Sequence, residues 1–169
     1  MGDTGVGERR AALVEQIRAA FSGVGRRGGV SLHEADVIDR YGSARERARA
    51  RRFDRERRWQ EVPGPDIEHY HWALSFLDPV GFRYYMPAYM VWALHNYETS
   101  HSASVDSTIY ALDYSDDLRA FALERYAQFS REQSQAVCAF LRFMAEDATG
   151  IADELVARRA LERYWNQFC

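Results

Sequence analysis

Histidine and glutamate recur at three-residue spacing in His95-x-x-Glu98-x-x-His101, a pattern that could hold a metal ion. Glu98 and His101 have the spacing that carboxylate-bridged helical bundles use, but such bundles need a second copy, and the sequence has none. His95 and His101 are also six residues apart, about 120° from alignment on an ideal helix. We therefore expect no metal and no cofactor, and a metal-dependent enzyme using these three residues is a less favoured alternative.

A glycine-rich string, Gly23-x-Gly25-x-x-Gly28, could bring the backbone close to a pyrophosphate, as it does in dinucleotide-binding proteins. That use requires a β-strand before the first glycine. The residues before Gly23 show helical spacing instead, so we interpret the string as a loop between helices.

All 22 basic side chains are arginine, and the absence of lysine excludes Schiff-base chemistry and the lysine of phosphate-binding loops. Nine arginines and three acids lie between Arg40 and Arg58. Arg47, Arg51, Arg55 and Arg58 share a helix face, and like charges so arranged repel unless something acidic lies against them. The nearest acidic candidate is the body of this protein. Nucleic-acid binding through a helix over residues 43–59 is the alternative.

Six aromatic residues, two prolines and one arginine lie between Phe76 and Trp92. One interpretation is structural: a kinked central helix pair in which Arg83 pairs with Asp78 or a C-terminal carboxylate. The other is functional, because tyrosine, tryptophan and arginine are enriched at binding hot spots. On that basis we predict a partner-binding surface made of Arg83, Tyr84, Tyr85, Tyr89 and Trp92.

No residue stands out as catalytic. The sequence has no G-x-S-x-G motif, and Cys138 falls in an apolar stripe where a thiolate is costly. Cys138 and Cys169 are the only cysteines, so we expect neither a disulfide framework nor a thiolate metal site.

Charge divides the chain into two parts. Residues 1–62 hold 14 arginines and 10 acids, net +4, whereas residues 63–169 hold 8 arginines and 15 acids, net −7. Pro63-Gly64-Pro65 marks the boundary. We predict a basic N-terminal helical arm (1–62) and an aromatic-rich helical body (66–169) that fold together as one domain.

The spacing of apolar residues and the capping residues predict a helix over residues 8–22, followed by helices that begin at the capping boxes Ser31-x-x-Glu34 and Ser43-x-x-Glu46. The second of these should end near Trp59. Asp66 and Asp78-Pro79 can begin further helices, and Pro87 should kink or break the chain before a helix over 88–97. A helical turn near Ile109 and helices over 116–129, 131–147 and 151–168 complete a predicted all-α, single compact domain of seven to nine helices.

The 169 residues, of which 47% are apolar, suffice for one domain. No apolar run approaches the roughly 20 residues that a membrane-spanning helix needs. We therefore expect a cytoplasmic protein without membrane contact.

Several strings resemble a family of small bacterial proteins of unknown function. The resemblance runs from Gly29 onward, weakens between Glu98 and Arg131, and is most specific in an FLDPxGFRYYMPAY-type signature. The strings that carry it are Leu32–Ser43, Asp54-x-Glu56-x-x-Trp59, Leu74–Asp78, Phe82–Tyr89, Glu132-Gln133 and Tyr164-Trp165. The resemblance implies a coherent helical domain and supplies no catalytic residues.

Together these patterns favour a non-catalytic protein that recognises an unknown protein partner, as adaptors and immunity proteins do. That comparison rests on size and class alone.

Overall fold

The computed structural model describes residues 2–169, and the side chains from residue 4 on. This part of the chain is all-α, with nine α-helices, four short 3-10 helices and no strand, as predicted. The α-helices are α1 (Gly2–Ala20), α2 (Leu32–Asp39), α3 (Ala44–Arg51), α4 (Gly64–His69), α5 (Pro79–Asn96), α6 (Ser104–Tyr110), α7 (Arg119–Tyr126), α8 (Arg131–Glu146) and α9 (Glu154–Arg163). The 3-10 helices are η1 (Trp59–Glu61), η2 (Ala73–Phe76), η3 (Asp116–Leu118) and η4 (Trp165–Phe168).

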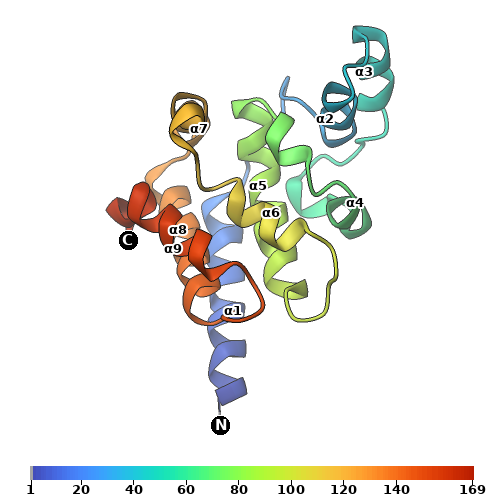
Figure 1. Cartoon of the computed structure of the whole chain (residues 1–169). Coiled ribbons are helices and arrows are strands. Elements are labelled where there is room, and N and C mark those ends of the chain that lie inside the picture. The colour runs from blue at the N-terminus through green and yellow to red at the C-terminus, as the bar shows by residue number, and fades with distance from the viewer. Residues whose placement is uncertain (1) are drawn as a thin grey trace.

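Helix α5 lies at the centre of the molecule and contacts α1, α4, α6 and α7 (Figure 1). Its side chains are buried on every side, as expected of a helix that is apolar all round. Helix α8 packs between α1 and α9, and a single apolar core runs from Leu13 of α1 to Trp165 of η4. Helices α2 and α3 form a lobe that projects from one end of this core (Figure 1).

The break expected at Pro87 does not occur. One helix runs from Pro79 to Asn96, with Pro87 inside it, in place of a kinked pair of helices. Proline removes one backbone hydrogen bond, but α5 is enclosed by other helices. Tertiary packing therefore holds the helical geometry that the local sequence disfavours.

Four predicted helix starts are confirmed by their caps. The hydroxyl oxygens of Ser43 and Ser130 accept hydrogen bonds from the backbone N–H groups three residues later, at 3.2 and 3.1 Å. Ser31 begins α2 with a reciprocal bond from its own N–H to the Glu34 carboxylate. Asp78 caps α5 by accepting a bond from the Gly81 N–H at 2.8 Å.

Other boundaries differ from the prediction. The first helix begins at Gly2 rather than at residue 8, and α3 ends at Arg51, well before Trp59. Helix α9 begins after its cap Asp153 rather than at residue 151. The start of α1 and the end of α3 lack a strong local signal, whereas α9 begins at a capping aspartate that the sequence analysis overlooked.

Cys138 and Cys169 form a disulfide, with Cα atoms 5.8 Å apart. The sequence did not predict this bond, because two cysteines 31 positions apart give no indication of proximity. The link joins the segment after η4 to the middle of α8.

Within residues 2–169, no helix combines the length and the apolar character needed to cross a bilayer.

Candidate functional site

The histidine pattern does not come together as a metal site. Glu98 pairs with Arg10 of α1 at 2.9 Å, and His101 is exposed in the segment after α5. Among the described residues, no group of three histidine, cysteine or acidic side chains is placed to hold a metal ion.

The glycine string forms a loop after a helix, not after a strand, as we interpreted it. Beyond it, Gly29 meets the start of α5, where a Cβ on Gly81 would lie 2.4 Å from the Val30 carbonyl oxygen. The Asp78 carboxylate joins the two segments by accepting bonds from both the Val30 and the Gly81 N–H groups. The glycines at this contact allow close packing between backbones.

Three of the five predicted partner-binding residues are inaccessible. Tyr84, Tyr85 and Tyr89 have no exposed surface. The Tyr85 hydroxyl donates to the Glu56 carboxylate at 2.9 Å, and that of Tyr89 donates to the Tyr70 carbonyl at 2.6 Å. Burial raises the pKa of all three phenols. These rings stabilise the core and cannot contact a partner in this fold.

The other two predicted residues, Arg83 and Trp92, are half-buried. Arg83 does not pair with Asp78 or a C-terminal carboxylate. Its Nε donates to the Gln133 side-chain oxygen at 3.0 Å, and the Gln133 amide donates in turn to the Ala20 carbonyl. Arg83 therefore contributes to a link among α5, α8 and α1.

A cavity of about 460 Å³ lies beneath α6 and α7 and against η2. Its volume is within the range typical of small-molecule sites. Four large aromatic side chains belong to the lining: Trp72 and Tyr114 are half-buried, and Tyr110 and Phe121 are exposed. Tyr110, Leu118 and Phe121, 50%, 57% and 43% exposed, leave apolar surface uncovered at the opening. No sequence motif pointed to this cavity.

Arg125 of α7 lies at the inner wall of the cavity with 5% of its surface exposed. One terminal nitrogen donates to the Leu74 carbonyl, and the guanidinium carbon is 3.7 Å from the centre of the Phe82 ring. The Nε has no hydrogen-bond partner, and no carboxylate of the described residues forms an ion pair with this side chain. Burial lowers the pKa of Arg125 to about 10, so the group is charged at neutral pH. A buried cation without a counter-ion is costly, because the ring and one carbonyl replace only part of its hydration.

Asp113 lines the same cavity, and its side chain is only 4% exposed. One carboxylate oxygen accepts a bond from Arg159 at 2.7 Å. The other has no hydrogen-bond partner, although Arg163 lies 3.7 Å from it. Arg159 and Arg163 therefore offset the charge of Asp113, while the Tyr110 hydroxyl donates to a second carboxylate, that of Asp153, at 2.6 Å.

A signal for Arg125 is present in the sequence. Ala122, Tyr126 and Phe129 form a buried stripe of α7 and the segment after it, and Arg125 is buried beside them. A charged residue within an apolar stripe is the kind of local conflict that often indicates a functional position.

The comparison with known families finds one family over most of the chain. The model of a family of unknown function, DUF6714, matches residues 9–169. The chain belongs to this family. No curated protein and no solved structure matches the chain. Membership in DUF6714 confirms that the chain belongs to a family of unknown function. It assigns no activity, so any function must be argued from the chain's own chemistry.

Proposed function

We propose that this protein is a non-catalytic binding protein whose cavity takes a small organic acid. The observation that supports the proposal is the unpaired, buried guanidinium of Arg125 at the wall of an aromatic-lined cavity. A carboxylate is the natural partner of such a group, because arginine donates two parallel hydrogen bonds to it.

The other residues of the cavity indicate which chemical groups the remainder of the ligand should carry. The rings of Trp72, Tyr114 and Phe121 suit an apolar or aromatic body. The unsatisfied oxygen of Asp113 suits one O–H or N–H donor on that body.

Recognition of a protein partner was the function expected from the aromatic stretch. With Tyr84, Tyr85 and Tyr89 buried, that stretch no longer supports it. The cavity instead supports the binding of a small organic acid, at a site outside the aromatic stretch.

Isothermal titration of the full chain with phenylacetate, 4-hydroxyphenylacetate and octanoate tests the proposal. We expect at least one acid to bind, and the corresponding amide to bind at least tenfold more weakly because it lacks the charge. Arg125→Met should lose at least tenfold in affinity, while Arg119→Gln, on an exposed residue of the same helix, should bind as the wild type does.

Folding of the variant is checked by urea denaturation. Arg125→Met should unfold at the same or a higher urea concentration than the wild type, because it removes a buried charge that lacks a counter-ion. Amides binding as tightly as acids, or Arg125→Met binding acids normally, would refute the proposal.

A further inference from the structure

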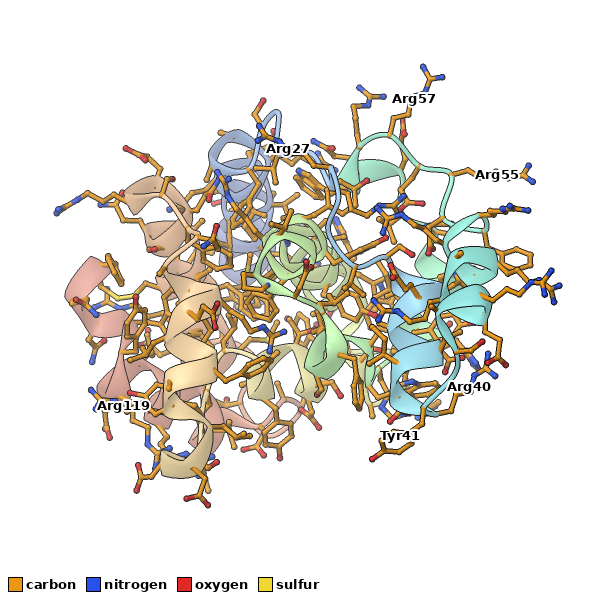
Figure 2. All side chains as sticks on the ribbon, turned by 90° about the horizontal axis from the view of Figure 1, so that it is seen from above. Arg27, Arg40, Tyr41, Arg55, Arg57 and Arg119 are labelled. Atoms are coloured by element: carbon orange, nitrogen blue, oxygen red, sulfur yellow. A yellow bond between two sulfur atoms is a disulfide. The ribbon has the colours of Figure 1, made fainter. Side chains whose placement is uncertain are left out.

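A second unexplained feature is a set of exposed arginines on the α2–α3 lobe and the loops beside it. We call it the arginine surface. It comes from the loop before α2, from α3 and from the segment between α3 and η1. Figure 2 shows Arg27, Arg55 and Arg57 along one edge of the molecule, with Arg119 on the far side. Its members are Arg27, Arg45, Arg49, Arg52, Arg55 and Arg57.

The arginines of this region divide into two groups. Arg47 and Arg51 turn inward and bind the Glu34 carboxylate, each at 2.9 Å. Arg26 turns inward to Glu56 at 3.1 Å. The arginine surface is what remains, and within the described residues none of its six members forms an ion pair.

Two of the three acids of the run are withdrawn from this surface, and only Glu46 is exposed on it. Asp54 and Glu56 have side chains only 3% and 6% exposed. Asp54 binds His33 at 2.7 Å, and Glu56 accepts bonds from Arg26 and Tyr85. Glu46 is exposed, but its carboxylate accepts a bond from the Ser43 N–H at 2.7 Å. The exposed face is therefore more positive than the sequence suggests.

Two aromatic rings are exposed on the same lobe. Tyr41 is 96% exposed and Phe53 is 71% exposed, the highest and third-highest values among the large apolar residues described. Phe53 directly follows Arg52 of the arginine surface, whereas Tyr41 lies beside Arg40 after α2, apart from Arg55 and Arg57 (Figure 2). An exposed ring between cations offers a stacking surface within reach of positive charge.

We propose that the arginine surface binds single-stranded nucleic acid, with phosphates on the unpaired arginines and bases on the rings of Tyr41 and Phe53. Charge complementarity favours a polyanion, since six guanidinium groups lack counter-ions. The rings favour a single strand, because its bases expose their faces, whereas a duplex stacks them inside. This site is distinct from the Arg125 cavity.

Fluorescence anisotropy with a labelled 20-nucleotide single strand, as DNA and as RNA, tests the proposal in the full chain. Affinity should fall with salt at a log–log slope of about −4, from roughly 0.7 per phosphate contact. The triple variant Arg45→Gln, Arg49→Gln, Arg52→Gln should reduce the magnitude of that slope by about 2. Its matched control is Arg119→Gln, Arg131→Gln, Arg142→Gln, which removes the same charge from exposed positions elsewhere and should leave the slope unchanged.

The role of the rings is tested at constant charge. Tyr41→Asn with Phe53→Ser should weaken single-strand binding at least about thirtyfold, because each of the two stacked bases contributes roughly 1–3 kcal/mol. Asparagine suits position 41 because the backbone there has φ 57°. Leu155→Ser, at an exposed apolar residue of α9, is the control and should bind normally.

Three results would overturn the proposal: equal effects of the two triple variants, unchanged binding after loss of both rings, or tighter binding of a duplex or of polyglutamate than of the single strand. Polyglutamate binding more tightly would assign the surface to an acidic protein. Arg125→Met should leave nucleic-acid binding intact, so the two proposals can fail separately.

Discussion

At the residue scale, the contrast between Arg125 and the neighbouring tyrosines shows what the sequence could and could not reveal. The cluster Tyr84, Tyr85 and Tyr89 resembles a hot spot in composition, yet all three rings are buried. Composition does not distinguish a ring that packs inside from one that binds outside. Arg125 is one of 22 arginines, and its conflict with the apolar stripe of α7 was recognised only once its burial and its unsatisfied Nε were known.

Two histidines should make opposite contributions to the pH dependence of stability. The hydrogen bond to Asp54 raises the pKa of His33. Burial, with the charges of Arg10 and Arg18, lowers the pKa of His95. A raised pKa contributes stability that is complete below the unfolded value of about 6.5 and is lost as pH rises through the folded value. A lowered pKa contributes stability that is present above 6.5 and is lost as pH falls.

Urea denaturation between pH 5 and 8.5 measures these contributions. Relative to the wild type, His33→Gln should gain stability as the pH rises, and His95→Gln should lose it. Parallel curves for both variants and the wild type would contradict this assignment.

At the scale of elements, four helix starts with local capping signals were predictable, whereas the starts of α1 and α9 and most helix ends were not. Capping residues at Ser31, Ser43, Asp78 and Ser130 are local signals, and each begins a helix. The end of α3 and the continuity of α5 through Pro87 depend on what packs against them, which no short window of sequence contains. The same limit explains the cavity, whose walls come from two segments separated in the chain, residues 71–75 and residues 107–125.

The contact between the loop before α2 and the start of α5 should tolerate no added side-chain carbon. A Cβ at Gly81 would lie 2.4 Å from the Val30 carbonyl oxygen and 2.9 Å from an Asp78 carboxylate oxygen. Gly81→Ala should therefore lower the free energy of unfolding by more than about 2 kcal/mol, as an overpacked core position does.

Gly28→Ala is the control, since nothing lies within 4 Å of a Cβ at that position. Urea denaturation of both variants should show a large loss for Gly81→Ala and a change within about 0.5 kcal/mol for Gly28→Ala. Equal losses would mean that backbone approach is not what requires Gly81.

At the scale of the whole molecule, one core joins the two charged parts of the chain. Helix α1 pairs with later residues through Arg9 with Asp147 and Arg10 with Glu98. The expected attraction between the arm and the acidic body is present there. It is absent at α3, where Arg47 and Arg51 pair with Glu34 of the neighbouring α2 instead.

The disulfide between Cys138 and Cys169 should stabilise the molecule by restricting the unfolded chain. Closing a loop of this length contributes about 3–4 kcal/mol in the chain-entropy model. Reduction should lower the melting temperature of the wild type, and Cys169→Ser should melt like the reduced protein under both conditions. A melting temperature unaffected by reduction would contradict this role. The cytoplasmic location expected from the sequence stays a prediction, and in that compartment the bond would be reduced.

The projection of the α2–α3 lobe away from the remaining helices has a practical consequence (Figure 1). Its exposed guanidinium groups are separated from most of the carboxylates, so the molecule is a macroscopic dipole despite its formal charge of −3. A charged chromatography resin binds the face of the protein that lies against it, so the charge of that face decides retention more than the total charge does. Near neutral pH and at low ionic strength, the purified protein should be retained by both cation and anion exchangers.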